Sequence, residues 1–192
     1  KVLDNVTCSF ESGKFYSILG QSGSGKTTLL SLLSGLDTIE EGDILYNGES
    51  IKKIGYNKYR NSYVNIIFQS YNLIPYMTAY ENVEVALDIA GIKLSKEDKK
   101  EKILSTLNEL GIDNSAAFRT VLKLSGGEQQ RVAIARCLVT DIPFIMADEP
   151  TGNLDEDTEK KIIDIFKKLA KQGKGVIVVT HSKELAESSD KI

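Results

Sequence analysis

The most constraining feature of this sequence is a glycine-rich segment close to its start. Residues 20–27 read GQSGSGKT and fit the pattern G-x-x-x-x-G-K-[ST] in full, between a strand-like run (residues 15–19) and an apolar helical run that stops at Gly35. Glycines let backbone N–H groups converge on phosphate oxygens, and the positive end of the following helix faces the same anion. A chance turn would give this match in roughly 1% of chains of this length. The predicted phosphate-binding residues are Gly20, Ser22, Gly23, Ser24, Gly25, Lys26, Thr27 and Thr28.

Two adjacent carboxylates, Asp148 and Glu149, follow a second apolar run at residues 144–147. Beside a phosphate-binding loop, Lys26 can reach the β- and γ-phosphates, and the Thr27 hydroxyl and the Asp148 carboxylate can ligate Mg²⁺. Glu149 is then free to orient or deprotonate an attacking water. Alone, such a pair is as often a solvated Asp-Glu pair at the end of a strand as a functional one. After a complete phosphate-binding loop, it predicts hydrolysis of a nucleoside triphosphate.

Strands and helices alternate along the chain, which predicts an α/β fold of three layers, as in P-loop NTPases. Between residues 70 and 125 the pattern becomes helical, with helix starts at Thr78 and Ser95. We therefore expect one domain, residues 1–192, with an ATP-binding core at 1–69 and 126–192 and an inserted helical subdomain at 70–125. The predicted strands cover residues 15–19, 43–46, 64–68, 144–147 and 176–180.

Composition narrows the class of protein further. The 192 residues carry a formal net charge of −3, which argues against a strongly basic nucleic-acid clamp. The two cysteines, Cys8 and Cys137, have neither metal-ligand nor redox spacing, so a reducing cytosolic compartment is expected. The longest apolar runs are too short to cross a bilayer. Any membrane role is therefore expected to depend on a partner.

A second phosphate-binding helix start is predicted at Ser125-Gly126-Gly127-Glu128. A serine hydroxyl, two unhindered glycine N–H groups and a helix dipole meet there. The simpler alternative is an ordinary N-cap, because Ser-x-x-Glu is a good capping box. A capping box, however, requires neither two successive glycines nor the RVAIAR segment that follows at residues 131–136.

With Leu124 before it, this segment resembles the signature motif of the nucleotide-binding domain of ATP-binding-cassette (ABC) proteins. The resemblance covers nearly the whole chain, with the motifs in the family's order. It implies that two such domains pair head to tail around ATP, so that the signature of one closes over ATP on the P-loop of the other. The residues implied to contact ATP across the dimer are Ser125, Gly126, Gly127, Glu128 and, in the D-loop, Asp155.

The same resemblance assigns two further site residues. Gln69 matches the Q-loop glutamine, which contacts Mg²⁺ or the lytic water. His181 matches the switch histidine, which contacts the γ-phosphate and helps to hold Glu149. A lone histidine is more often structural, but its place directly after an apolar strand favours the functional interpretation. The implied catalytic residues are Glu149, His181 and Gln69, the implied Mg²⁺ ligands are Thr27, Gln69 and Asp148, and the implied cofactors are ATP and Mg²⁺.

The segment at residues 70–80, SYNLIPYMTAY, is unusually apolar for a loop. It can pack between the two parts of the domain, or it can form a groove for a partner, and both can hold at once. In the family, this region receives a coupling helix of the membrane permease. Its sequence, which contains Asn-Leu-Ile-Pro, resembles that of the family branch with lipoprotein-releasing, macrolide-efflux and peptide-antibiotic-resistance cassettes. The implied partners are an integral membrane permease and a second ATPase subunit, most simply an identical one, with no nucleic acid. The implied location is the cytoplasmic face of the membrane.

Both ends of the chain depart from the family pattern. No aromatic residue can be assigned to adenine stacking, because Phe10, Phe15 and Tyr16 fall within the predicted strand pattern. The chain stops at residues 189–192, where the family continues into further strands, so it is expected to be trimmed at both ends. The predicted function is ATP hydrolysis that powers a separate permease. The alternatives are an ABC ATPase that regulates a membrane complex and a non-transport ATPase of DNA repair, chromosome structure or translation.

Overall fold

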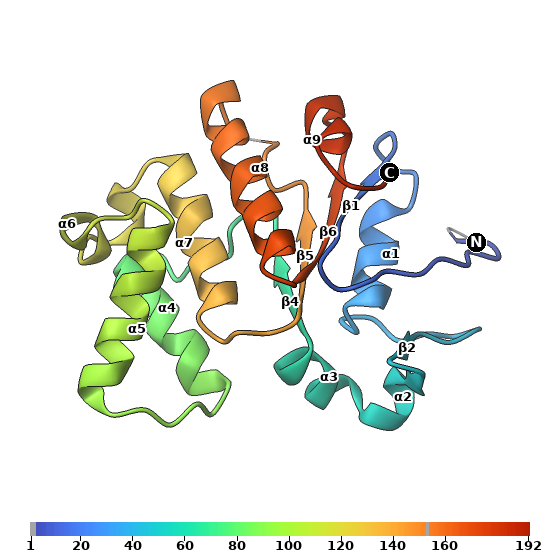
Figure 1. Cartoon of the computed structure of the whole chain (residues 1–192), viewed down its shortest axis with the longest axis horizontal. Helices are drawn as coiled ribbons and strands as arrows, with labels where there is room; N and C mark the ends of the chain where they lie inside the picture. Colours follow the sequence, from blue (N-terminus) through green and yellow to red (C-terminus); the bar gives the residue numbers. More distant parts are fainter. Residues whose placement is uncertain (1–2, 153) are drawn as a thin grey trace.

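The core of the molecule is a sheet of four parallel strands (Figure 1). The computed structural model describes residues 3–152 and 154–192. The strand order is β1-β6-β5-β4, so the first strand lies beside the last one in the chain. Because all four strands are parallel, their carboxyl ends share one edge, where the loops that follow them can meet. The strands are β1 (Phe15–Leu19), β4 (Val64–Ile67), β5 (Phe144–Asp148) and β6 (Gly175–Thr180).

Helices cover both faces of this sheet and give the predicted three layers (Figure 1). On one face, α1 (Lys26–Leu33) packs on β5 and β6; on the other lie α7 (Gly126–Leu138) and α8 (Glu156–Lys171). The apolar side chains of each strand alternate between the two faces: Val178 joins the core on the α8 side and Val179 joins that on the α1 side. A short α9 (Lys183–Glu187) packs against β1 and β6.

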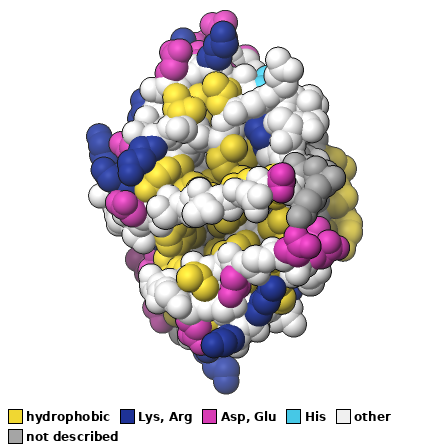
Figure 2. Space-filling model, turned by 90° about the vertical axis from the view of Figure 1, so that its right-hand side faces the viewer, with side chains coloured by type: hydrophobic (Ala, Val, Ile, Leu, Met, Phe, Trp, Pro, Cys, Tyr) yellow, Lys and Arg dark blue, Asp and Glu magenta, His cyan; other side chains and the backbone are white. Residues whose placement is uncertain are grey.

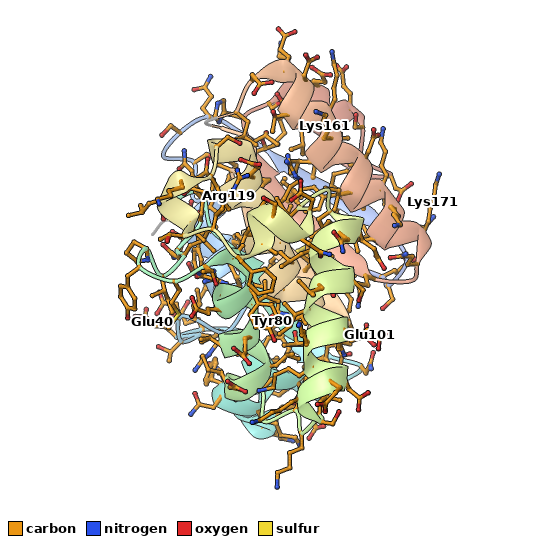
Figure 3. All side chains as sticks on the ribbon, turned by 90° about the vertical axis from the view of Figure 1, so that its left-hand side faces the viewer. Glu40, Tyr80, Glu101, Arg119, Lys161 and Lys171 are labelled. Carbon is orange, nitrogen blue, oxygen red and sulfur yellow. The ribbon has the colours of Figure 1, made fainter. Side chains whose placement is uncertain are left out.

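The predicted helical region contains α4 (Ala79–Ile89), α5 (Lys96–Glu109), the single turn α6 (Asn114–Ala117) and a 3₁₀ turn at Val121–Lys123. Both predicted helix starts are confirmed: Thr78 and Ser95 accept hydrogen bonds from backbone N–H groups of the first turns. Figure 3 shows α4 and α5 side by side, with Tyr80 on α4 and Glu101 on α5. Both helices also pack on α7, so one apolar cluster runs from the sheet to α5.

The predicted strand at residues 43–46 is shorter and lies outside the main sheet. Only Leu45–Tyr46 (β2) is extended, and it pairs with Glu49–Ser50 (β3) in an antiparallel hairpin. Asn47 (φ +50°) and Gly48 (φ +83°) close this hairpin, and such a two-residue turn returns the chain at once. Leu45 is consequently 61% exposed. Two short helices follow, α2 (Ile51–Ile54) and α3 (Tyr56–Ser62), and lead into β4.

Within residues 3–152 and 154–192, no helix combines the length and the apolar character that crossing a membrane requires.

Candidate functional site

The glycine-rich loop joins β1 to α1 and leaves the start of α1 open. Gly25 is the N-cap of α1 in the left-handed conformation (φ +89°), and no side chain caps the N–H groups of its first turn. Gly23 also has a positive φ of +81°, and a Cβ built on it would have no atom within 4 Å. Uncapped N–H groups beside open space at a helix N-terminus can bind an anion. By contrast, side chains cap α4, α5, α7, α8 and α9.

Lys26 extends back over this loop. Its Nζ donates hydrogen bonds to the carbonyl oxygens of Gly20 at 2.8 Å and Gln21 at 2.9 Å. The turn is tight, since a Cβ on Gly20 would lie 2.8 Å from Ser24 Oγ. The ammonium group and the uncapped N–H groups are thus held at one place, and both attract phosphate oxygens.

Asp148 is the last residue of β5, and its side chain faces the start of α1, which packs on that strand. Its Oδ1 accepts a hydrogen bond from Thr27 Oγ1 at 3.3 Å. Burial raises the pKa of the Asp148 carboxyl, and the bond from Thr27 opposes that shift. A partly buried carboxylate beside a hydroxyl offers two of the oxygen ligands that Mg²⁺ prefers. The residues present therefore fit a magnesium ion.

Glu149 lies between the ends of β5 and β6 in a strained conformation. Its φ is +45°, a left-handed value that residues other than glycine seldom adopt. Its N–H donates to the carbonyl of Val179 at 2.9 Å, so the strain is fixed by the neighbouring strand. Its Oε2 lies 2.9 Å from His181 Nδ1 and accepts from the His181 backbone N–H at 3.2 Å. The Glu149 side chain is 15% exposed and that of His181 is 64% exposed.

A cavity of about 740 Å³ joins these elements at the carboxyl edge of the sheet. Figure 2 shows the only histidine of the chain near the upper edge of the α1 face. Gln69 enters the cavity from the end of β4, and its Nε2 would lie 3.3 Å from a Cβ on Gly152. One residue that the sequence did not single out, Gln21, also lines it. The predicted residues in its wall are Ser22, Gly23, Gly25, Lys26, Thr27, Thr28, Gln69, Asp148, Glu149 and His181.

Gly20 and Ser24 belong to the same loop but do not line the cavity. The residues predicted to act across a dimer form a separate surface at the N-termini of α7 and α8. Ser125 accepts a hydrogen bond from the N–H of Glu128 at 3.3 Å, while Glu128 accepts from the N–H of Ser125 at 2.7 Å. Asp155 caps α8 by accepting hydrogen bonds from the N–H and the hydroxyl of Thr158, at 3.0 and 2.8 Å. A Cβ on Gly127 would lie only 2.5 Å from Thr158 Cγ2. None of these residues contributes to the 740 Å³ cavity, so the structure does not bring the two sets together within one chain.

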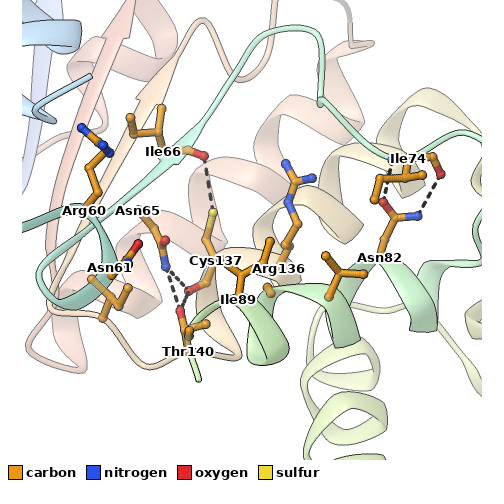
Figure 4. A pocket seen from close by; sticks show the side chains of 14 residues that line it. Arg60, Asn61, Asn65, Ile66, Ile74, Asn82, Ile89, Arg136, Cys137 and Thr140 are labelled. Carbon is orange, nitrogen blue, oxygen red and sulfur yellow. Dashed lines mark hydrogen bonds between the residues drawn. The ribbon is translucent and has the colours of Figure 1, made fainter. Parts of the chain in front are cut away.

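The apolar segment at residues 70–80 is partly packed against the core and partly exposed. Leu73 packs against the core, whereas Tyr76 is 78% exposed. Ile74 lines a second cavity of about 300 Å³ between β4, α4 and α7 (Figure 4). Arg136 on α7, which the sequence did not single out, donates to the carbonyl oxygens of Tyr71 and Asn72.

Comparison with known proteins agrees with this geometry. The ABC transporter family matches residues 3–152. The uncharacterised ABC transporter ATP-binding protein YclH of Bacillus subtilis is 52% identical over 98% of this chain and 83% of its own length. The lipoprotein-releasing system ATP-binding protein LolD of Aquifex aeolicus is 42% identical over 97% of this chain and 84% of its own. The macrolide export ATP-binding/permease protein MacB of Brucella melitensis is 40% identical over 100% of this chain and 30% of its own.

Among solved structures, the dimeric bacterial ABC transporter cassette MJ0796 has a TM-score of 0.89 and 38% identity, covering 100% of this chain and 85% of its own. A second structure of that cassette holds ADP and Pi in a post-hydrolysis state. The resemblance to the branch that includes lipoprotein-releasing and macrolide-export cassettes is confirmed. This chain therefore belongs to the ATP-binding proteins of the ABC transporter family, and it is an ATPase.

Proposed function

We propose that the 740 Å³ cavity binds ATP with Mg²⁺ and that Glu149 is the general base for hydrolysis. The β- and γ-phosphates would contact Lys26 and the N–H groups of the loop, including those of Gly23, Gly25 and Thr28. The main support for this proposal is the position of the Glu149–His181 pair, which lines the same cavity as this loop. A carboxylate there can accept the proton of a water in line with the terminal phosphate.

Thr27, Asp148 and Gln69 are the residues that would hold Mg²⁺. The hydrogen bond of 3.3 Å between Thr27 and Asp148 already places a hydroxyl beside a carboxylate, which supports this assignment. When bound, the ion would neutralise negative charge on the phosphates. Gln69, at the edge of the same cavity, would hold either the ion or the attacking water.

His181 would hold Glu149 in place and donate a hydrogen bond to the γ-phosphate. Two contacts with one carboxylate oxygen, through Nδ1 and the backbone N–H, support the first role. The largely exposed ring supports the second. Because Nδ1 faces Glu149, the bond to the phosphate would come from Nε2, and a ring that donates from both nitrogens is the doubly protonated imidazolium.

The surface at the N-termini of α7 and α8 would complete the site of a second subunit, most simply an identical one. Ser125, Gly126, Gly127 and Glu128 would close over the partner's ATP, and Asp155 would reach across the interface. The dimeric arrangement of MJ0796 supports this pairing. So does the separation of these residues from the cavity of their own chain.

The chain would also dock on an integral membrane permease at the cytoplasmic face of the membrane. The 300 Å³ cavity supports such a contact, because it is lined by apolar side chains including Ile66, Ile74 and Ile89, with Arg60 and Arg136 at its border (Figure 4). It lies where residues 70–125, the proposed helical subdomain, meet the proposed ATP-binding core at 1–69 and 126–192. MacB, whose name pairs an ATP-binding part with a permease, supports the same partner.

Glu149→Gln tests the proposal most directly. We expect hydrolysis to fall at least about 100-fold, because a general base supplies that much or more. ATP binding should remain, and a closed dimer should accumulate on size-exclusion chromatography in ATP and Mg²⁺. Glu101→Gln, a matched change on the outer face of α5 (Figure 3), should leave turnover unchanged. Undiminished hydrolysis in the Glu149 variant would refute its role as base.

Co-purification from gently solubilised membranes tests the permease contact. Ile89→Asp places a charge on an exposed position of the 300 Å³ cavity, whereas Leu36→Asp changes an exposed leucine outside its wall. The first variant should lose a multi-helix membrane protein that the wild type and the second variant retain. Equal recovery by all three would contradict docking at this cavity.

A further inference from the structure

One carboxylate oxygen on α8 joins two loops that flank the Glu149–His181 pair. Glu159 Oε1 accepts a hydrogen bond from Thr151 Oγ1 at 3.0 Å and another from Ser182 Oγ at 2.8 Å. Thr151 follows β5 and Ser182 follows β6, so the two donors come from loops that are far apart in the sequence. Thr151 is 4% exposed, which makes its hydroxyl costly to leave without a partner.

These two loops are the ones that carry the pair itself. Thr151 lies two residues after Glu149, and Ser182 directly follows His181. The segments are therefore joined twice, once by the 2.9 Å contact between Glu149 and His181 and once through Glu159. The hydrogen bonds through Glu159 form a second connection between the two loops, which restricts how far Glu149 can move from His181.

Glu159 is itself fixed at the start of α8. Its backbone N–H donates to the carbonyl of Asp155 at 2.9 Å, and Asp155 caps the helix through Thr158. Any displacement of the α8 N-terminus therefore acts on the Thr151 and Ser182 hydroxyls through a short, hydrogen-bonded path. Asp155 is also the residue proposed to reach across the dimer interface.

We propose that Glu159 is a positioning residue that holds the loops of Glu149 and His181 in register and couples them to the start of α8. This rests on the proposed role of Glu149 as general base and of Asp155 at the interface. Displacement of Asp155 by a partner's nucleotide is then transmitted through Glu159 to the pair that acts on the chain's own ATP.

A purely helical role for Glu159 does not account for this geometry. Acidic residues in a first turn stabilise a helix through its dipole, and α8 also has Glu156 and Asp157 there. Both of those are exposed, whereas Glu159 is half-buried with two hydroxyls on one oxygen. The dipole requires a charge near the helix end but no such convergence.

The test compares Glu159→Ala with Glu159→Gln and with Asp164→Ala, which removes an exposed carboxylate from the same helix. The Gln amide oxygen can still accept from both hydroxyls, but it carries no charge. His181 is the only histidine in the chain, so its ring gives the only histidine ring signals in an NMR spectrum of the nucleotide-free protein. These signals report directly on the position of the pair.

We expect Glu159→Ala to shift the His181 ring signals and to lower kcat about tenfold, with KM for ATP within about twofold, because a small displacement of a reacting group is costly. Glu159→Gln and Asp164→Ala should resemble the wild type in both measurements. Unchanged signals and kcat in a folded Glu159→Ala would overturn the proposal. So would a Gln variant as impaired as the Ala variant, because charge alone would then explain the effect.

Two further variants keep the outcome interpretable. If Glu159→Ala does not fold, Thr151→Val removes one hydroxyl donor at nearly constant shape, and the ring signals should shift by a smaller amount. No shift there would equally overturn the proposal. Glu149→Gln, measured alongside, separates the two hypotheses: full activity in that variant refutes the catalytic assignment, whereas an inactive Glu149→Gln with a wild-type-like Glu159→Ala refutes only the tether.

Discussion

Arg136 donates a hydrogen bond from its guanidinium to the backbone carbonyl of Tyr71 at 3.0 Å. A second bond, 2.6 Å long, goes to the carbonyl of Asn72. Tyr71 (φ +59°) and Asn72 (φ +49°) both have left-handed backbones, so this arginine holds a strained turn. The turn begins two residues after Gln69, and the tyrosine hydroxyl would lie 3.3 Å from a Cβ on Gly126. The two ends of α7 thereby lie close to one residue of the loop after β4.

Arg136→Ala should therefore destabilise the protein and disturb Gln69 together. Loss of hydrogen bonds from a charged donor to two carbonyl oxygens is expected to lower the free energy of unfolding by about 2 kcal/mol. Hydrolysis should fall severalfold because the turn behind Gln69 can relax. Urea unfolding and steady-state ATPase assays measure the two effects. Arg119→Ala is the matched control, since that guanidinium bonds Ser115 within its own turn. Equal behaviour of both variants would contradict the clamp.

Gly127→Ala should be destabilising for a reason that a second substitution can remove. The new Cβ would lie 2.5 Å from Thr158 Cγ2, and such overpacking costs about 1–3 kcal/mol. Thr158→Ser deletes that methyl group but keeps the hydroxyl that donates to Asp155. In the Thr158→Ser background the same Gly-to-Ala change should become neutral or stabilising, because alanine favours a helix by up to about 1 kcal/mol. A double-mutant cycle, with each variant unfolded in urea, measures whether the effect of Gly127→Ala on the free energy of unfolding changes sign between the two backgrounds.

The functional part of that cycle is separate from its stability part. If Gly127 also approaches a partner's phosphate, as proposed, the stable double variant should still lose ATPase activity. Recovery of both stability and full activity would assign Gly127 to packing alone.

Lys26→Ala should abolish most of the stabilisation that ATP gives. At ATP concentrations about 100 times the wild-type Kd, binding adds about 2.7 kcal/mol to the free energy of unfolding. For a domain of this size that corresponds to an increase in Tm of roughly 5–11 °C. The variant should show little increase under the same conditions. Lys52→Ala, which removes another ammonium that donates to a backbone carbonyl, Gly42, should keep the full increase. A thermal shift assay with and without ATP decides between these outcomes.

The sequence predicted the parts of the site that depend on local patterns. The loop at residues 20–27, the carboxylates after β5 and the capping boxes at Thr78 and Ser125 each require residues within a few positions of one another. The contacts of Glu159 and Arg136 could not be predicted in this way. Arg136 meets a carbonyl 65 positions away, and Glu159 meets a hydroxyl 23 positions away. Such contacts depend on how each helix is rotated against its neighbours, which hydrophobic periodicity fixes only coarsely.

Acid should weaken the capping box of α7 in a predictable direction. The Ser125 N–H bond to Glu128 holds the pKa of that carboxyl below its usual value, which is about 4.3. The ionised form is thus favoured in the folded state. Its contribution to the free energy of unfolding is complete above about pH 4.3, and it is lost as the pH falls through the lower pKa of the folded state. In Glu128→Gln this contribution is absent. The difference in free energy of unfolding between wild type and variant should therefore narrow from about pH 6 to about pH 3.

The size of this narrowing should be about 0.5 kcal/mol or less, because the carboxylate is largely solvated and water screens its interactions. Urea unfolding at several pH values measures it, with Glu101→Gln on the outer face of α5 as the matched change (Figure 3). The Glu128 difference should narrow more than the Glu101 difference does. If it instead widens toward acid, the bond from Ser125 does not favour the ionised carboxyl in the folded protein, and the capping box contributes through its neutral hydrogen bonds alone.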